Sequence, residues 1–367
     1  MNDERYMRVA LTLAQKGCGY VNPNPMVGAV IVKDGRIIGQ GWHEKYGQLH
    51  AERNALANCE QPPEGATMYV TLEPCCHFGK TPPCTDAILQ SKIARVVIGS
   101  LDPNPLVSGK GISILQNGGV EVAAGVLEPE CNKLNEIFFH FITTGKPFVL
   151  MKYAMTMDGK IATAAGKSKW ITGELARNNV HKYRHRYAAI MVGVGTVLAD
   201  DPMLTCRMEN GKNPARIICD TNLRTPVASN VVATANLADT IIATSCTEGK
   251  KHKPYSDAGC EVLVVSRKNG QADLNHLMQA LGKRNIDSVL LEGGGELNFS
   301  ALRSGIVNRV HAYISPKIFG GSGAKTPVGG TGISEVSECF GLKTQRITWL
   351  DEDLLIESEV EYPCLQG

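Results

Sequence analysis

The spacing of apolar residues predicts an amphipathic helix at residues 4–17, where they recur at helical intervals. Strand-like apolar runs follow at residues 28–32, 37–39, 68–72 and 95–99, and helical segments are expected at residues 50–58 and 82–91. Lys33-Asp34-Gly35 joins the first two runs and is a hairpin signal, because Asp-Gly suits a tight turn. Strands that alternate with helices indicate the α/β fold class.

A second α/β region begins after residue 145. Thr143-Thr144-Gly145-Lys146-Pro147 follows a helix-like run at 135–142 and precedes a new strand at 148–152, so it is the predicted linker. Further strand-like runs lie at residues 189–192, 216–220, 240–244, 261–265, 288–292 and 309–314, before a closing hairpin at 344–362. We therefore expect two domains, residues 1–145 and 146–367.

Composition and charge narrow the classes of function. The chain is 43% apolar and 20% charged, which is typical of globular proteins. Its 38 Lys and Arg nearly balance 36 Asp and Glu, so no overall field attracts nucleic acid or an anionic membrane. No apolar stretch reaches the ~18 residues of a membrane span, and Met1-Asn2-Asp3-Glu4-Arg5 does not open a signal peptide, so we predict a cytoplasmic location. The 12 irregularly spaced cysteines favour metal binding or catalysis over a disulfide framework.

The strongest chemical signal combines His50-Ala51-Glu52 with Cys75 and Cys84. One imidazole and two thiolates fill three positions of a tetrahedral zinc site, and the fourth is left for a water whose pKa falls toward ~7. Glu52 lies two residues after the histidine and can act as a base beside that water without being a ligand. His-x-Glu with Pro-Cys-x-x-Cys is the signature of zinc nucleobase deaminases, but here eight residues separate the two cysteines.

Other interpretations stay open at this point. Cys76 and His77 are rival ligands, and His77 as a fourth ligand would give a closed zinc site in a non-enzymatic, zinc-stabilised scaffold. The cysteines can also belong to a core without metal. A closed site has no use for Glu52, which favours the catalytic interpretation. The alternative enzyme is a nucleic-acid-base zinc deaminase with an appended domain, and the balanced charge weighs against it.

Longer segments resemble a known family, the bifunctional riboflavin-biosynthesis deaminase/reductases. In the first half these are Asn22-Pro23-Asn24-Pro25, the run TLEPCCHFGKTPPC at residues 71–84, and Asp102-Pro103-Asn104-Pro105. In the second half they are KYAMTMDGKIA at residues 152–162, Trp170-Ile171-Thr172-Gly173 and VLADDPMLT at residues 197–205. The long loop between the two cysteines is typical of this family, and the resemblance covers essentially the whole chain.

The resemblance implies a first domain with a three-layer, cytidine-deaminase-like fold. This domain would deaminate a phosphorylated pyrimidine, 2,5-diamino-6-ribosylamino-4(3H)-pyrimidinone 5′-phosphate. One zinc ion would be held by His50, Cys75 and Cys84, while Glu52 would carry a proton from water to the ring nitrogen and the leaving amine. The implied substrate-site residues are Asn24, His43, His77, Lys80 and Asn104.

Two glycine clusters of the second half, at residues 192–196 and 291–297, suit a phosphate-bearing ligand because glycine permits close approach of the backbone. Neither cluster matches the G-x-G-x-x-G dinucleotide fingerprint. The resemblance implies a dihydrofolate-reductase-like domain, which binds NADPH without that fingerprint. The implied cofactor contacts are Ala154, Trp170, Thr196, Asp200, Thr221, Gly294, Gly295, Glu296, Leu297, Asn298, Phe299 and Ser300. The implied substrate contacts are Ser168, Arg184, Leu204, Arg207 and Glu292.

The implied second reaction reduces the ribosyl group of the deaminated product to a ribityl chain. Arg184 and Arg207 suit a ribose 5′-phosphate, because a guanidinium binds phosphate oxygens in a bidentate fork. Lys152 and Asp200 are both candidates for the acid of this step, and the sequence does not choose between them. We further expect a homo-oligomer, either a dimer or a tetramer, with no nucleic-acid or membrane partner.

Overall fold

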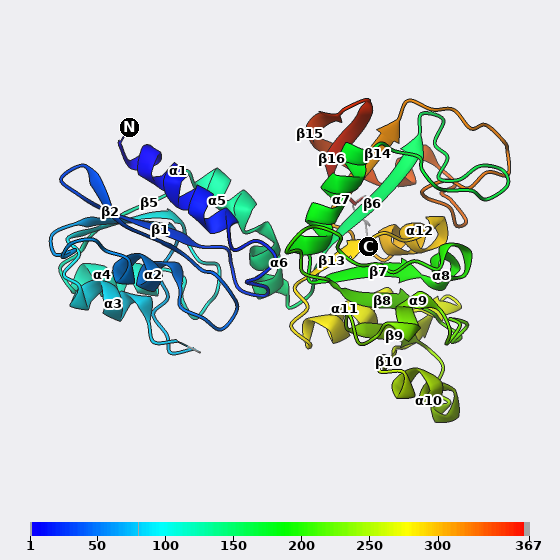
Figure 1. Ribbon diagram of the computed structural model, residues 1–367, viewed down its shortest axis with the longest axis horizontal. Helices are drawn as coiled ribbons and strands as arrows, with labels where there is room; N and C mark the ends of the chain where they lie inside the picture. Colours follow the sequence, from blue (N-terminus) through cyan, green and yellow to red (C-terminus); the bar gives the residue numbers. More distant parts are fainter. Residues whose placement is uncertain (1, 80, 363–367) are drawn as a thin grey trace. The chain divides into compact units, whose positions relative to one another are not determined.

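The computed structural model describes residues 2–79 and 81–362, and it contains two compact units, Met1–Gly145 and Lys146–Gly367. The division between them falls within the segment 143–147, where the sequence predicts a linker. Figure 1 shows that each unit has its own sheet with helices packed around it. Both units are therefore of the α/β class that the alternation of strands and helices predicts.

A five-stranded mixed sheet forms the centre of the first unit, and its strands are β1 (Gly28–Lys33), β2 (Arg36–Trp42), β3 (Thr67–Leu72), β4 (Arg95–Ser100) and β5 (Glu121–Ala124). Their order in the sheet is β2-β1-β3-β4-β5. β1 pairs antiparallel with β2 and β3, whereas β3, β4 and β5 are parallel. Asp34 and Gly35 both have positive φ, 50° and 74°, as the tight turn of a twisted hairpin requires.

Helices cover both faces of this sheet and complete the three predicted layers (Figure 1). They are α1 (Asn2–Gln15), α2 (Ala51–Ala57), α3 (Cys84–Gln90), α4 (Lys110–Asn117), α5 (Glu128–Leu134) and α6 (Glu136–Thr144). Val30 of β1 packs in a buried cluster with α1 and α5, and its neighbour Ile31 packs in another with α2, α3 and α4. The two clusters lie on opposite faces, because successive side chains of a strand point to opposite sides of the sheet.

Glycine allows α2 to lie close to the sheet. A Cβ at Gly41 of β2 would be 2.3 Å from the backbone nitrogen of Ala55 and 2.6 Å from the carbonyl oxygen of Ala51. Any larger residue would therefore displace α2. That displacement would also move His50 and Glu52, because His50 is the N-cap of α2 and Glu52 lies in its first turn.

A nine-stranded sheet forms the centre of the second unit, and its strands are β6 (Phe148–Thr156), β7 (Ala189–Gly193), β8 (Ala215–Cys219), β9 (Thr240–Thr244), β10 (Glu261–Val264), β13 (Ser288–Leu291), β14 (Arg309–Ser315), β15 (Gly341–Leu350) and β16 (Asp353–Glu361). Their order is β10-β9-β8-β7-β13-β6-β14-β16-β15. The strands from β10 to β14 in this order are parallel, and the β15–β16 hairpin adds antiparallel to β14. Loops that follow the parallel strands therefore meet at one edge of the sheet, where ligands of such folds bind.

The remaining elements of the second unit are α7 (Glu174–Arg186), α8 (Val194–Asp200), α9 (Asn230–Ala233), α10 (Gly249–Asp257), α11 (Leu274–Gly282), α12 (Gly295–Arg303), the short strands β11 (Arg267–Lys268) and β12 (Gln271–Ala272), and a 3₁₀ turn at Val336–Glu338. One buried cluster joins α11 and α12 to Met191 of β7, and a second joins α8, α9 and α10 to the neighbouring Ile190. The sheet thus has apolar packing on both faces, as long parallel sheets require.

Most predicted elements are confirmed, with small shifts at their ends. The strands expected at 28–32, 68–72, 95–99 and 148–152 are β1, β3, β4 and β6, and the closing hairpin is β15–β16. Between residues 100 and 134 the sequence predicts no element, whereas the structure contains α4, β5 and α5. β5 has only four residues, all at least partly exposed, so no apolar run marks it. Among the described residues, none of the helices combines the length and the apolar character that a membrane crossing needs.

Candidate functional site

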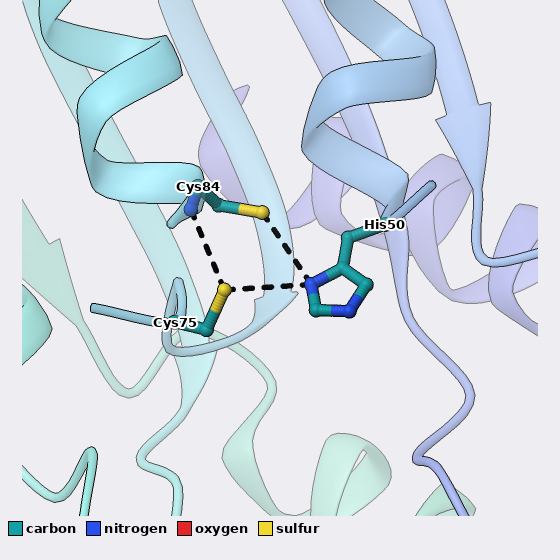
Figure 2. A group of neighbouring side chains, drawn as sticks. All are labelled: His50, Cys75 and Cys84. Carbon is teal, nitrogen blue, oxygen red and sulfur yellow. Dashed lines mark hydrogen bonds between the residues drawn. The ribbon is translucent and has the colours of Figure 1, made fainter. Parts of the chain in front are cut away.

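Three side chains from separate elements of the first unit meet as a potential metal centre. His50 is the N-cap residue of α2, Cys75 lies in the loop after β3, and Cys84 is the first residue of α3. Figure 2 shows both sulfur atoms directed at the imidazole. The Sγ atoms of Cys75 and Cys84 lie 3.4 Å and 3.5 Å from His50 Nδ1, and Cys75 Sγ also accepts the backbone N–H of Cys84 at 3.4 Å.

These distances fit a zinc ion. Zinc bonds of ~2.3 Å to sulfur and ~2.0 Å to nitrogen, at tetrahedral angles, place the sulfur and nitrogen ligands ~3.6 Å apart. The ligand atoms of His50, Cys75 and Cys84 all lie within 4.8 Å of one another. A hydrogen bond from Cys84 lowers the pKa of the Cys75 thiol, and the same contact raises that of Cys84. The pair therefore already stabilises one thiolate, the form that binds zinc.

The two rival ligands lie outside this cluster. Cys76 Sγ instead contacts the carbonyl oxygen of Leu106 at 3.7 Å. His77 lines the adjoining cavity, and its buried Nδ1 has no hydrogen-bond partner in the described part of the chain. Within residues 2–79 and 81–362, no fourth His, Cys, Asp or Glu joins His50, Cys75 and Cys84. This arrangement leaves one tetrahedral position open to solvent or substrate.

Glu52 follows the metal ligand His50 by two residues, in the first turn of α2. Its side chain is only 3% exposed, it lines the same cavity as His50, and burial raises the pKa of its carboxyl group. The next residue, Arg53, donates from NH2 to the carbonyl oxygen of Pro83 at 2.7 Å and from Nε to that of Pro82 at 3.2 Å. Arg53 thereby ties the helix that carries His50 and Glu52 to the two residues that precede Cys84.

A cavity of about 280 Å³ opens beside the cluster. Four of the predicted substrate residues line it together with His50, Glu52 and Cys75, namely Asn24, His43, His77 and Asn104. The fifth, Lys80, lies outside the described residues. The sequence therefore placed residues from four distant segments in one cavity, which spans the loop before β1, the end of β2, and the loops after β3 and β4.

Hydrogen bonds hold the walls of this cavity in place. His43 contacts the carbonyl oxygen of Leu49 through Nδ1 at 3.0 Å and the side-chain nitrogen of Asn24 through Nε2 at 3.1 Å. The neutral imidazole satisfies both contacts by donating at Nδ1 and accepting at Nε2. Burial lowers the pKa of His43, which favours this neutral form. The buried amide of Asn135 fixes the Asn24 loop from below through the backbone N–H and C=O of Met26, at 2.8 and 2.9 Å.

Glu73 and Asp102 are functional-site residues that the sequence analysis did not single out. The Glu73 carboxylate is buried and accepts backbone N–H bonds from Gly109 at 3.0 Å and Ile112 at 3.3 Å, which anchors the loop that bears Asn104. Asp102 lines the cavity, and burial raises the pKa of its carboxyl group to about 6. Both residues lie within the segments that carry the family resemblance, so the signal was present, but their roles depend on tertiary packing.

The second unit contains two cavities that meet. The smaller, of about 290 Å³, lies over β6, and the larger, of about 760 Å³, follows the ends of β13, β7 and β8. Four predicted residues line both cavities, namely Ser168, Thr196, Asp200 and Gly294. This arrangement has room for an extended ligand in the larger cavity whose end reaches a second ligand in the smaller one.

The predicted contacts divide between these cavities. Only the smaller is lined by Ala154, Trp170, Arg184, Arg207 and Glu292, so Ala154 and Trp170 lie on the substrate side of the expected cofactor site. Only the larger is lined by Thr221, Gly295, Glu296, Leu297 and Ser300. Three expected contacts line neither cavity. Leu204 is buried in an apolar cluster, Phe299 is buried with the guanidinium of Arg303 over its ring, and Asn298 donates to the carbonyl oxygen of Pro327 at 2.8 Å.

A buried ionic network forms the floor of the smaller cavity. Glu292, at the end of β13, binds Arg184 of α7 in a bidentate fork, with distances of 2.8 and 2.9 Å, and lies 3.8 Å from Lys152 Nζ of β6. Burial opposes ionisation of Glu292, but Arg184 and Lys152 outweigh it and lower its pKa to about 2. Burial also lowers the pKa of Lys152, which Glu292 partly offsets. The Arg184 guanidinium, which the sequence assigned to a substrate phosphate, therefore binds the Glu292 carboxylate in the structure.

Arg207 and His181 form a second polar group in the same cavity. The Nε–H and the backbone N–H of Arg207 each lie 3.2 Å from a ring nitrogen of His181. Burial and the nearby Arg184 and Arg207 lower the pKa of His181 to about 4. His181 is therefore uncharged, and the ring nitrogen that carries no proton can accept one of these two bonds from Arg207.

The larger cavity fits a dinucleotide. Its wall includes the glycines of both predicted clusters, among them Gly193, Gly195 and Gly294, and the space around a Cβ at Gly195 is open. The N-terminus of α12 begins at Gly295 on the same wall, where backbone N–H groups suit a diphosphate. The donor set and the volume match an NADPH site that lacks the G-x-G-x-x-G fingerprint.

Comparisons with known proteins agree with both sites. Residues 1–100 match the cytidine and deoxycytidylate deaminase zinc-binding region, and residues 147–356 match the RibD C-terminal domain. Fold and sites together define a two-domain enzyme that joins a zinc-dependent deaminase to an NADPH-dependent reductase. The chain belongs to the RibD family, the bifunctional deaminase/reductases of riboflavin biosynthesis.

Individual relatives cover nearly the whole chain. The riboflavin biosynthesis protein RibD of Actinobacillus pleuropneumoniae is 55% identical over 99% of this chain and 96% of its own length. RibD of Escherichia coli is 40% identical over 87% of this chain and 89% of its own. The solved structure of the diaminohydroxyphosphoribosylaminopyrimidine deaminase/5-amino-6-(5-phosphoribosylamino)uracil reductase of Thermotoga maritima has a TM-score of 0.88 at 42% identity, with 99% of both chains covered.

These findings confirm the fold class inferred from the resemblance, a cytidine-deaminase-like first domain and a dihydrofolate-reductase-like second domain. They also confirm that the chain is an enzyme with zinc and NADPH as cofactors. The alternative of a nucleic-acid-base deaminase with an appended domain is not supported, because the second domain matches the RibD reductase. A non-enzymatic zinc scaffold is excluded on the same ground.

Proposed function

We propose that this enzyme deaminates 2,5-diamino-6-ribosylamino-4(3H)-pyrimidinone 5′-phosphate and then reduces the ribosyl group of the product to a ribityl chain with NADPH. Two sites in one chain support the proposal. The first unit has an open His-Cys-Cys cluster beside buried Glu52, and the second unit has two adjoining cavities for a cofactor and a substrate. The name of the Thermotoga maritima relative, which covers the whole chain, supports this order of steps.

In the deaminase unit, His50, Cys75 and Cys84 would hold the zinc ion, which would serve as a Lewis acid and lower the pKa of water at the open position. Glu52 takes one proton from the water and gives it to the ring nitrogen as the water oxygen adds to the amino-bearing ring carbon. It then takes the second proton from the new hydroxyl and gives it to the amine as the C–N bond breaks. Ammonia is thereby released and a ring carbonyl remains. The cavity wall formed by Asn24, His43, His77 and Asn104 orients the substrate, and Lys80 is a further proposed substrate contact.

In the reductase unit, the walls of the larger cavity would hold NADPH, which would supply the hydride that reduces the sugar carbon. Lys152 is the acid that protonates the sugar oxygen, since it lines the smaller cavity and its lowered pKa makes its proton easier to donate. Asp200 is less suited to donate a proton, because its Oδ1 is already the acceptor of a hydrogen bond from the Ser168 hydroxyl at 3.3 Å. Glu292, itself held by Arg184, positions Lys152, and the two terminal nitrogens of the exposed Arg207 guanidinium are left to bind the 5′-phosphate.

Incubation of the purified protein with the diaminopyrimidine substrate tests the proposed order. We expect ammonia release with and without NADPH, and NADPH consumption only after ammonia has been released. Both products are measured in the same stopped reaction, by an ammonia assay and by absorbance of the reduced nicotinamide. NADPH consumption that begins before deamination, or ammonia release that requires NADPH, would contradict the proposal.

The proposal includes a homo-oligomer, dimer or tetramer, built through β15. This ten-residue strand lies at the edge of the nine-stranded sheet and exposes Leu342, Ile347 and Trp349, the last at 69%. A long edge strand with exposed apolar side chains offers unpaired backbone groups to a second copy, and an antiparallel pair of identical edges is self-complementary.

Trp349→Glu is expected to reduce the molecular mass in light scattering to that of a single chain, because it places charge on the proposed interface. Leu237→Glu changes a similarly exposed apolar residue away from β15 and should leave the mass of the oligomer unchanged. A wild-type protein that is monomeric at micromolar concentration would overturn this part of the proposal. A cytoplasmic location belongs to the same proposal and is supported by the eleven described cysteines, which form no disulfide.

A further inference from the structure

One end of the larger cavity carries an arginine without an internal partner. Arg224 lines this cavity, is exposed, and makes no hydrogen bond or ion pair with any residue in 2–79 or 81–362. A second nearby arginine is occupied, since Arg267 donates to Asn222 Oδ1 at 2.6 Å. An unpaired guanidinium that faces a cavity wall is suited to bind an anionic group of a ligand.

The loop that carries Arg224 is held firmly. Asp220 is fully buried at the end of β8, and its Oδ2 accepts the backbone N–H of Thr225 at 2.6 Å and its hydroxyl at 2.8 Å. These two bonds close the segment around Arg224 into a compact turn. Thr221 adds a link across the cavity wall, because its hydroxyl accepts the backbone N–H of Ala272 at 3.0 Å. Arg224 is thus presented from a fixed backbone, and little order has to be gained on binding.

The order of strands shows which end of the cofactor this loop meets. The nicotinamide ring has to reach the substrate, so it would lie where the two cavities meet, a place lined by Thr196, Asp200 and Gly294. Lys152 is on β6, and the Arg224 loop follows β8, which lies three places along the order β8-β7-β13-β6. At ~4.8 Å for each step, the loop is roughly 14 Å from the reacting end. That span is suited to the adenosine ribose at the other end of an extended dinucleotide.

The diphosphate has a separate place between these ends. The N-terminus of α12 lies on the cavity wall, and Gly295 packs against the carbonyl oxygen of Thr326, which a Cβ would approach to 2.8 Å. Lys325 is the other basic residue on this wall besides Arg224, and it precedes Thr326 in the chain, so its backbone lies near the start of α12, where the diphosphate would bind. Arg224 is left for an anion at the adenosine end, and the 2′-phosphate is the group that NADPH has there and NADH lacks.

We propose that Arg224 binds the 2′-phosphate of NADPH and gives this reductase its preference for NADPH over NADH. The inference rests on the proposed function, since it takes the larger cavity as the cofactor site. Removal of the guanidinium should weaken binding only of ligands that carry a 2′-phosphate. A charge-assisted hydrogen bond of this kind corresponds to a tenfold or greater change in affinity.

Calorimetric titration of the full-length protein with 2′,5′-ADP and with 5′-ADP tests this without any turnover. Wild type should bind 2′,5′-ADP at least tenfold more tightly than 5′-ADP. Arg224→Ala should remove this difference by weakening 2′,5′-ADP alone, and Arg224→Lys should retain part of it. Arg36→Ala, which removes the same charge from an exposed position in the other unit, should behave as wild type.

Two outcomes would overturn the inference. If Arg224→Ala binds 2′,5′-ADP as tightly as wild type, or loses affinity for both nucleotides equally, Arg224 does not read the 2′-phosphate. If wild type binds neither nucleotide but consumes NADPH, the adenosine end lies elsewhere and the inference fails while the proposed function stands. If wild type neither binds nucleotides nor consumes NADPH, the proposed function fails with it.

Discussion

Glu52→Gln is expected to lower the rate of deamination by ~10²–10⁴-fold, because an amide of the same shape cannot accept and return the proton that a carboxylate carries. Zinc content should stay at one ion per chain, since Glu52 is not part of the His50, Cys75 and Cys84 cluster. Reduction of the deaminated substrate should continue at the wild-type rate, because that chemistry belongs to the second unit. Ammonia release, zinc content and NADPH consumption are measured on the same preparation.

Glu60→Gln provides the matched control. Glu60 is an exposed carboxylate shortly after the helix that carries Glu52, so the same change should leave both activities intact. Deamination by Glu52→Gln at the wild-type rate would remove Glu52 from the mechanism. Loss of zinc together with activity would show that Glu52 supports the metal site instead of moving a proton.

Lys152→Met is expected to lower the reductase kcat by ~10²–10⁴-fold while the dissociation constant of NADPH stays the same. Lys152 lines the smaller cavity but not the larger one, so its loss removes the proton donor without touching the cofactor wall. Arg184 continues to neutralise Glu292 through its two hydrogen bonds, which preserves the fold. Single-turnover oxidation of NADPH and fluorescence titration of the cofactor measure the two quantities.

A charge-conserving variant separates proton donation from simple charge. Lys152→Arg keeps the cation, but a guanidinium is a far weaker acid, so its reductase kcat should be low as well. In wild type the reductase kcat should fall as pH rises through the pKa of Lys152, which lies below its usual value because the side chain is buried. Lys182→Met, an exposed change on α7, is the control. A Lys152→Arg enzyme with the wild-type rate and pH profile would contradict the role as acid.

Local patterns were enough to predict much of the fold. The Asp34-Gly35 turn specified the β1–β2 hairpin, since both residues can adopt the positive φ that such a turn needs. Pro83 just before Cys84 marked the start of α3, where a missing N–H has no cost. By contrast, Leu127 is the N-cap of α5 at a positive φ of 56°, so no typical capping residue marked that helix, although Pro129 lies in its first turn. The order of strands in the larger sheet also has no local signal, because it depends on packing between distant segments.

The candidate sites show the same division. The metal cluster could be predicted from short sequence spacings, because its ligands lie at the ends of consecutive elements whose positions the sequence marks. The network of Glu292 with Arg184 joins residues 108 apart, and it needs β13 to lie beside both β6 and β7. The sequence therefore named both residues as substrate contacts but could not show that they bind each other. Leu204 was likewise named as a contact, which stays a prediction, and no local pattern showed that its side chain joins a buried cluster with Ile218 and Val231.

Zinc K-edge X-ray absorption of the metal-replete protein is the most direct test of the central claim, that His50, Cys75 and Cys84 hold an ion with one position left open. We expect one zinc per chain, with two sulfur ligands near ~2.3 Å and two nitrogen or oxygen ligands near ~2.0–2.1 Å. Addition of a competitive pyrimidine ligand should change only the light-atom shell. A third sulfur, or a shell unchanged by the ligand but altered in His77→Ala, would show a closed site and contradict the account.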